Sequence, residues 1–110
     1  MYSKCTMQQV EQIGCVKEAT RILGDKWTPQ LLRFFINNES LRFCQVQDMV
    51  EGINPRTLSA RLDTLEKEGI ILKVTSPEKA RCEYRLTDKG RELLPVLRDM
   101  EAWSHRFAAA

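Results

Sequence analysis

The sequence has no long hydrophobic run. The longest apolar stretch in its 110 residues, Leu31–Ile36, is interrupted by Arg33. A membrane-spanning helix needs about 20 apolar residues, so we expect no membrane partner. The first residues also lack a basic segment followed by an apolar one, which is the pattern of a signal peptide. We therefore expect a cytoplasmic protein.

Metal-ligating and catalytic residue types are scarce. The four cysteines form no Cys-x-x-Cys pair and the single histidine, His105, stands alone, so we expect no metal site. The absence of a glycine-rich loop that could cradle a phosphate also argues against an enzyme, and we expect no cofactor. In the cytoplasm the thiols stay reduced unless one acts as a sensor. They are Cys5, Cys15, Cys44 and Cys82.

Charge of one sign is not in large excess. The net charge of +2 does not by itself indicate nucleic-acid binding. The excess falls in residues 53–86, which hold seven basic and five acidic residues, because the rest of the chain is balanced. With 43% hydrophobic residues, the chain is long enough for one globular domain with a modest core.

The clearest helix lies in residues 53–69. Asn54 is a good N-cap, Pro55 fits the first helical position and Gly69 ends the helix. One stripe of this helix is apolar, and it consists of Leu58, Leu62 and Leu65.

The opposite face of this helix carries small, hydroxyl and basic side chains, with no acidic residue before Asp63. Such a face can lie close to an anion, and its side chains can reach phosphates or base edges. An ordinary solvated helix face has a similar composition, so both readings stay open at this point. The residues of this face are Arg56, Ala60, Asp63 and Lys67, flanked by Thr57 and Ser59.

Three helices are expected before this one. They are Cys15–Leu23, Pro29–Asn37 and Phe43–Glu51, with a short strand at Leu41–Phe43. The first turns Val16, Ala19 and Leu23 inward, and the third turns Phe43, Val46, Met49 and Val50 inward. Only Gly52 and Ile53 separate the third helix from the next, which is typical of a helix-turn-helix. A structural helical hairpin looks similar.

After Gly69 the pattern alternates. Ile70–Thr75 and Arg81–Leu86 are expected to form a hairpin, and a hairpin directly behind a helix-turn-helix is a wing. In the second strand Cys82, Tyr84 and Leu86 share one face. The wing residues Lys79 and Arg81 could reach phosphates or the minor groove, although solubility alone would also account for them.

A last helix is expected from Asp88 to about Phe107, and Pro95 should kink or divide it. Its apolar residues recur at threes and fours: Leu93, Val96, Leu97, Met100, Trp103 and Phe107. They could close the domain's own core or pair with a second copy of the chain. We favour both roles together, because two-fold dimers are the commonest assembly.

These elements predict one α+β domain, mostly α: a winged helix-turn-helix with a two-stranded wing and a C-terminal dimerisation helix. We expect an N-terminal arm or short helix over residues 1–14, the DNA-binding region over 15–86 and the dimerisation helix over 87–110.

The chain resembles the HxlR family of winged helix-turn-helix transcriptional regulators, relatives of the MarR-type regulators. The matching stretches follow the family's order and spacing over most of residues 15–97. They are Cys15-Val16, Gly24–Trp27, Leu41–Phe43, Ile53–Glu66, Gly69-Ile70 and Glu83–Gly90.

The resemblance implies a homodimer that binds a pseudo-palindromic operator in double-stranded DNA, with one helix of each subunit in the major groove. The residues then expected near base edges are Asn54, Arg56, Thr57, Ser59 and Ala60, and phosphate contacts are expected from Arg42, Arg61, Lys79 and Arg81. Some members of the family use a cysteine placed like Cys15 to sense oxidants or electrophiles. A thiol at a helix start is reactive because the dipole stabilises the thiolate, although a small buried hydrophobe would also suit this position.

Two other functions stay open. A winged helix can serve protein contact alone. A regulator could instead bind a small molecule in a cavity lined by Trp27, Phe35, Trp103 and Phe107, which otherwise would be plain core. The acid-free first half of the helix over 54–68 favours DNA binding over protein contact.

Overall fold

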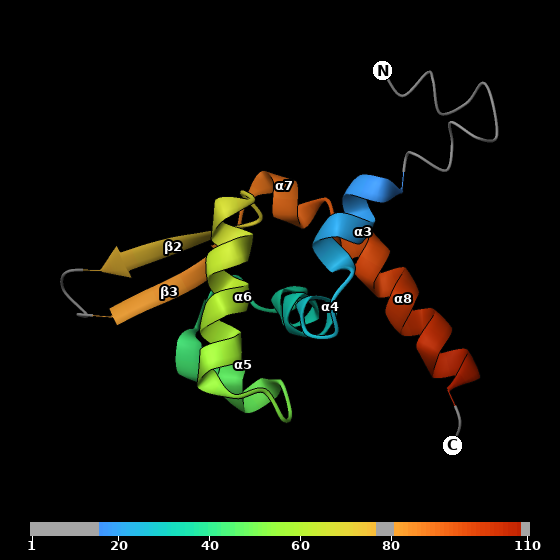
Figure 1. Ribbon diagram of the computed structural model, residues 1–110, viewed down its shortest axis with the longest axis horizontal. Helices are drawn as coiled ribbons and strands as arrows, with labels where there is room; N and C mark the ends of the chain where they lie inside the picture. Colours follow the sequence, from blue (N-terminus) through green and yellow to red (C-terminus); the bar gives the residue numbers. More distant parts are fainter. Residues whose placement is uncertain (1–15, 77–80, 109–110) are drawn as a thin grey trace.

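The computed structural model describes residues 16–76 and 81–108. In chain order its elements are α3 (Lys17–Leu23), α4 (Thr28–Leu32), the 3-10 turn η1 (Arg33–Phe35), β1 (Leu41–Arg42), α5 (Phe43–Met49), α6 (Pro55–Lys67), β2 (Ile71–Ser76), β3 (Arg81–Leu86), α7 (Asp88–Arg91) and α8 (Leu94–Phe107). Figure 1 shows the β2–β3 hairpin reaching out on one side of α6 and α8 running away on the other. None of the helices in this part of the chain has the length and apolar character needed to cross a membrane.

One hydrophobic core joins the helices to the sheet. Helix α6 contributes Leu58, Leu62 and Leu65, all buried as predicted. Burial of one leucine side chain contributes about 1.5–3 kcal/mol, so this stripe alone holds α6 firmly against the domain. The other buried apolar residues are Ile22, Leu31, Leu32, Phe35, Leu41, Val46, Val50, Ile53, Ile70, Ile71, Tyr84, Leu86 and Leu97.

Both ends of α6 are satisfied by local hydrogen bonds. At its start the amide of Thr57 donates to Asn54 Oδ1 at 2.8 Å, which confirms the predicted N-cap. At its end Gly69 has a φ of +77°, and the amide of Ile70 donates to the carbonyl of Leu65 at 2.9 Å. This is a Schellman ending, so α6 stops where its glycine predicts.

The sheet has three antiparallel strands in the order β1-β3-β2. The predicted hairpin is confirmed, but the two-stranded wing expected from the sequence gains β1 as a third strand, with Leu41 opposite Tyr84. Strand β1 has two residues because Phe43 already begins α5, where the amide of Arg42 donates to Gln45 Oε1 at 2.8 Å. Tyr84 and Leu86 are buried and share one face, as their alternation predicts.

The first helices differ from expectation in register and length. The predicted inward position of Val16 is wrong: the helix begins at Lys17, Val16 is 60% exposed, and Ile22 is buried in its place. The helix expected up to Asn37 ends at Leu32, and the chain continues as the tighter 3-10 turn η1 up to Phe35.

Met49 was also expected inward and is exposed. It is the last residue of α5, and Val50 turns into an extended conformation directly after it. Val50 and Ile53 fill the core at this place, which leaves Met49 on the rim.

The C-terminal segment forms two helices, which confirms the division predicted from Pro95. The break falls between Arg91 and Leu94, and Pro95 lies in the first turn of α8, where its missing amide costs nothing. Helix α7 is held against the end of α6 by a close approach at Gly90. A Cβ added to Gly90 would lie 2.2 Å from the carbonyl oxygen of Ile70, so only glycine fits there.

Candidate nucleic-acid interface

Helices α5 and α6 and the turn between them form the helix-turn-helix. Gly52 has a φ of +86°, a left-handed conformation that favours glycine, and it reverses the chain. The following Ile53 is 5% exposed and anchors the turn in the core. The turn therefore sets the orientation of α6 relative to α5.

The outer face of α6 brings together the residues predicted to meet base edges. Asn54, Arg56, Ser59 and Ala60 are exposed, and Thr57 is half-buried. No ion pair involving Arg56 occurs within residues 16–76 and 81–108. The free amides at the start of a helix add partial positive charge, so this half of α6 favours an anion.

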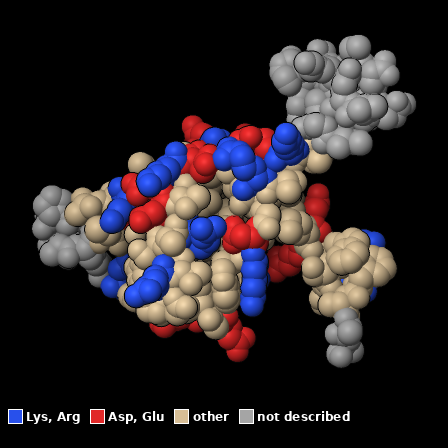
Figure 2. All heavy atoms as spheres, viewed as in Figure 1, with Lys and Arg blue, Asp and Glu red and all other residues tan. Residues whose placement is uncertain are grey.

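The charge on the face that α6 presents is mixed rather than uniformly basic. Figure 2 shows Lys and Arg side chains there among uncharged and acidic ones. This agrees with the small net charge of +2. Attraction of DNA would thus depend on a few placed cations and the start of α6, not on a broad positive field.

Arg61, expected from the sequence to contact a phosphate, lies next to Asp25. Its Nη1 is 3.4 Å from Asp25 Oδ2, and both side chains are about one-third exposed, 32% and 33%. The pair joins the middle of α6 to the connection between α3 and α4. Arg61 is thereby engaged inside the protein rather than free on the outer face.

Asp25 organises that connection. Its Oδ1 accepts hydrogen bonds from the amides of Trp27 and Thr28, each at 2.8 Å, and its Oδ2 accepts one from Thr28 Oγ1 at 2.5 Å. Burial raises the pKa of Asp25, but the hydrogen bonds from Thr28 and Trp27 and the charge of Arg61 outweigh burial, so its pKa lies below the ordinary value.

The remaining predicted DNA contacts are described only in part. Arg42 is half-buried, and it is both the last residue of the edge strand β1 and the N-cap of α5. Arg81 begins β3, and Lys79 lies outside the described residues. In the rest of the hairpin Lys73 is exposed, and Arg85 Nη2 pairs with Glu39 Oε2 at 3.0 Å.

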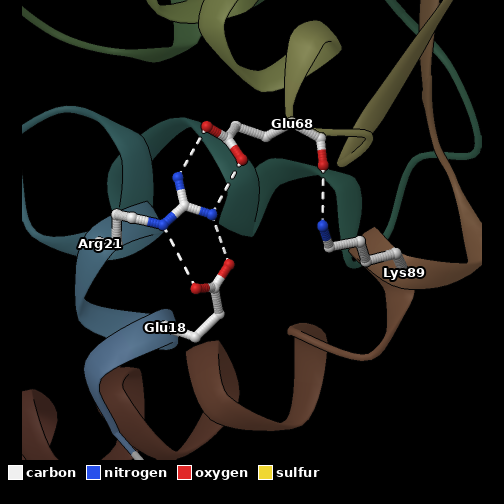
Figure 3. Close-up of polar contacts among 4 residues, drawn as sticks. All are labelled: Glu18, Arg21, Glu68 and Lys89. Atoms are coloured by element: carbon white, nitrogen blue, oxygen red, sulfur yellow. Dashed lines mark hydrogen bonds and ion pairs between the residues drawn. The ribbon is translucent and has the colours of Figure 1, made fainter.

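Sequence reasoning missed a polar cluster at the other end of α6. Figure 3 shows Arg21 of α3 between Glu18 and Glu68, and Lys89 of α7 at the carbonyl of Glu68. Arg21 Nη1 and Nη2 donate to the two carboxylate oxygens of Glu68 at 2.7 and 3.0 Å. The hydrogen bonds from Arg21 hold the pKa of both Glu18 and Glu68 below its ordinary value. The i, i+3 spacing of Glu18 and Arg21 is visible in the sequence, but the contact with Glu68, 47 residues away, has no local signal.

Helix α8 divides its apolar residues between two surfaces. Leu97 is buried in the chain's own core, and Leu93 packs partly against it. The other predicted interface residues are exposed: Val96, Met100, Trp103 and Phe107. The rings of Trp103 and Phe107 lie 5.2 Å apart, so they form one continuous aromatic surface.

The four aromatic residues considered from the sequence as a cavity lining lie in different environments within the chain, and a cavity near the dimer helices stays a prediction. Phe35 belongs to the core, while Trp103 and Phe107 are exposed on α8. A groove of about 280 Å³ lies between α4 and α8. Its lining consists of Pro29, Gln30, Arg33, Leu97, Met100, Glu101 and Ser104.

The thiols fall into two groups. Cys5 and Cys15 lie outside the described residues. Cys44 is exposed on α5, and Cys82 is half-buried on β3 with its Sγ 3.4 Å from Thr75 Oγ1. The described part of the chain contains no group of His, Cys, Asp and Glu residues arranged to hold a metal ion.

A capped helix behind a glycine-containing turn, followed by an antiparallel hairpin, defines the winged helix-turn-helix class of DNA-binding proteins. Within this class, residues 22–110 match the family described as HxlR-like helix-turn-helix. The chain belongs to this family of transcriptional regulators, as its sequence motifs predict.

Relatives and solved structures agree with this assignment. The HTH-type transcriptional regulator YvaP of Bacillus subtilis is 36% identical over 99 residues, which cover 89% of this chain and 91% of YvaP. The redox regulator HypR in its oxidised form has a TM-score of 0.80 at 27% identity, covering 86% of this chain and 98% of that one. The transcriptional regulator YodB of B. subtilis in its reduced form has a TM-score of 0.72 at 27% identity, covering 84% and 90%, and YodB has also been solved with a quinone bound.

Proposed function

We propose that this protein binds a pseudo-palindromic operator as a homodimer and places one α6 helix of each protomer in the major groove. The observation that carries the proposal is the first half of α6. Its outer face combines exposed Asn54, Arg56, Ser59 and Ala60 with the start of a helix, and its first acidic residue is Asp63. Small side chains allow close approach to bases, and Arg56, which forms no ion pair with the described residues, is suited to guanine.

The wing supplies the second contact region in this proposal. Lys79 lies between β2 and β3 in the sequence and Arg81 begins β3, and both would bind phosphates beside the groove that α6 occupies. Arg42 would serve a phosphate near the start of α5. Arg61 is the weakest of the phosphate residues expected from the sequence, because Asp25 already engages it.

Dimerisation through α8 is supported by the exposure of its apolar face. Trp103 is 62% exposed and Phe107 is 59% exposed, on a helix whose residues from Arg98 onward are all exposed. Burial of large aromatic side chains is strongly favourable, so packing against a second copy of α8 would remove this apolar surface from water. Two-fold symmetry then sets the two α6 helices one or more turns of DNA apart, about 34 Å per turn.

We further propose that oxidants or electrophiles act on this regulator through Cys15. Support comes from the similarity to HypR, a redox regulator, and to YodB, which binds a quinone. Cys15 lies two residues before α3 begins. Treatment of the protein with diamide should change DNA affinity in the wild type but not in Cys15→Ser. Cys44→Ser, which removes an exposed thiol of α5, is the control and should respond like the wild type. An equal response of all three proteins would exclude Cys15 from the response.

Binding of the purified protein to a random DNA duplex at several salt concentrations tests the DNA-binding proposal. The affinity should fall steeply as salt rises, because phosphate contacts release counterions. Absence of measurable binding at low salt would instead favour the rival function, a winged helix used only for protein contact.

A further inference from the structure

We propose that Arg21 is a positioning residue for DNA binding: it fixes the C-terminal end of the recognition helix α6 to α3, so that the placement of α3 controls the docking of α6. The inference rests on the proposed DNA binding by α6. It concerns a cluster of residues that takes no part in the proposed contacts between the outer face of α6 and DNA.

The cluster holds one residue of α6 from two directions. Glu68 is the C-cap of α6, and its carboxylate accepts both Arg21 Nη1 and Nη2, at 2.7 and 3.0 Å. Its main-chain carbonyl accepts Lys89 Nζ at 2.9 Å. As Figure 3 shows, α3 and α7 thus meet the same turn of α6, one through the side chain and one through the backbone of Glu68.

The contact between Arg21 and Glu68 is directional in a way that the leucine stripe is not. Apolar packing tolerates small rotations and slides of a helix, because the hydrophobic effect has no preferred direction. A guanidinium that donates two parallel hydrogen bonds to one carboxylate fixes both distance and orientation. Glu18 also accepts from Arg21, but this contact stays within α3 and does not reach α6.

Helix α3 has few other anchors of its own. It has seven residues, of which Ile22 is buried and Leu23 packs partly against the core. Val16, directly before it, is 60% exposed. An element with little buried surface moves at low cost, so a change at the start of α3 would reach α6 through Arg21.

Arg21 lies too far from the proposed contact surface to bind the same phosphates as Arg56. The 13 residues of α6 span about 20 Å, and Glu68 follows the end opposite Asn54. The effect of Arg21 on DNA affinity should therefore come through the position of α6 and not through a phosphate contact.

Titration of DNA with Arg21→Gln at several salt concentrations tests this inference. We expect the affinity to fall roughly threefold to tenfold while the dependence on salt stays that of the wild type. Glu68→Gln should behave alike, and exchange of the pair in Arg21→Glu with Glu68→Arg should restore part of the loss. Glu18→Gln is the matched control: it removes a carboxylate from the same cluster, leaves the bridge to α6 intact and should bind almost like the wild type.

Wild-type affinity of Arg21→Gln would overturn the inference, and so would a loss of affinity accompanied by a weaker salt dependence, which would mark a direct phosphate contact. If Arg21→Gln does not fold, Arg21→Lys keeps the charge without the two-pronged geometry and should show a smaller loss of the same kind. Amide hydrogen exchange separates this inference from the proposed function. Even if the wild type fails to bind DNA, the amides of Gly69 and Ile70 should exchange faster in Arg21→Gln than in Glu18→Gln, and equal rates would refute the bridge.

Discussion

Asp25 Oδ2 lies 3.4 Å from Arg61 Nη1, and this contact joins the start of α4 to the middle of α6. The same carboxylate accepts the first amides of the α4 turn. The side chain of Asp25 therefore stabilises the start of α4 and also contacts α6. The negative charge of Asp25 is thus compensated by Arg61 and by the amides of Trp27 and Thr28.

Replacement of Asp25 by Ala should lower the free energy of unfolding by about 1 kcal/mol at pH 7, which is the usual effect of removing a carboxylate that caps helix amides. The pKa of Asp25 is lowered from 3.8 in the folded state. A lowered pKa means that the carboxylate stabilises the fold above 3.8, and that this stabilisation is lost as the pH falls toward the folded-state pKa. The difference between wild type and variant in urea unfolding should hold from neutral pH to pH 5 and narrow below 3.8; a difference that grows on acidification would contradict this role.

Replacement of Gly90 by Ala should destabilise the domain by about 1–3 kcal/mol, the typical effect of overpacking. The new Cβ would meet the carbonyl oxygen of Ile70 at 2.2 Å, so the backbone of α7 or of the strand start must shift. Gly69→Ala provides the comparison, because a Cβ there meets nothing within 4 Å and its cost arises only from the φ of +77°. Urea unfolding measures both variants, and an unchanged midpoint for Gly90→Ala would show that the approach of α7 is looser than described.

Replacement of Trp103 by Glu should convert the proposed dimer to a monomer, because it places a charge in the centre of the exposed stripe of α8. Sedimentation equilibrium should then give the chain mass of 12.8 kDa for the variant and twice that mass for the wild type. Arg91→Ala, an exposed change on α7, serves as the control and should remain dimeric. A monomeric wild type would contradict the proposed dimerisation through α8.

Replacement of Arg56 by Ala should weaken operator binding by about 1–3 kcal/mol and relax the preference for one base pair. Replacement of Lys79 by Ala should weaken binding to operator and random duplex alike, and should lower the salt dependence by about one counterion. Fluorescence anisotropy with both duplexes distinguishes the two patterns. If both variants bind like the wild type, the assignment of the contact surface is incorrect.

Local chemistry made α6 and the break before α8 predictable. Asn54, Pro55 and Gly69 mark helix ends through interactions within a few residues, and Pro95 acts on its own turn. The alternation in β3 likewise placed Tyr84 and Leu86 on the buried face because one side of the hairpin packs on the core.

Features that depend on distant partners were not predictable. Arg21 and Glu68 meet only because α3 packs beside the end of α6, and nothing near either residue indicates the other. The sequence predicted that Val16 is buried, but Ile22 is buried instead. The start of α3 was hard to predict because its N-cap, Val16, has no side chain that could form a capping hydrogen bond. The engagement of Arg61 with Asp25 is of the same kind, because a basic residue on a helix looks equally free in sequence whether or not a carboxylate lies opposite.

Footprinting of the wild-type protein on its operator, selected from genomic DNA that co-purifies with it, tests the central claim most directly. We predict protection of two symmetric half-sites in the major groove, spaced by whole turns of about 34 Å, with both half-sites weakened together by Arg56→Ala. A single protected half-site, or a footprint that Arg56→Ala leaves unchanged, would contradict the insertion of paired α6 helices into DNA.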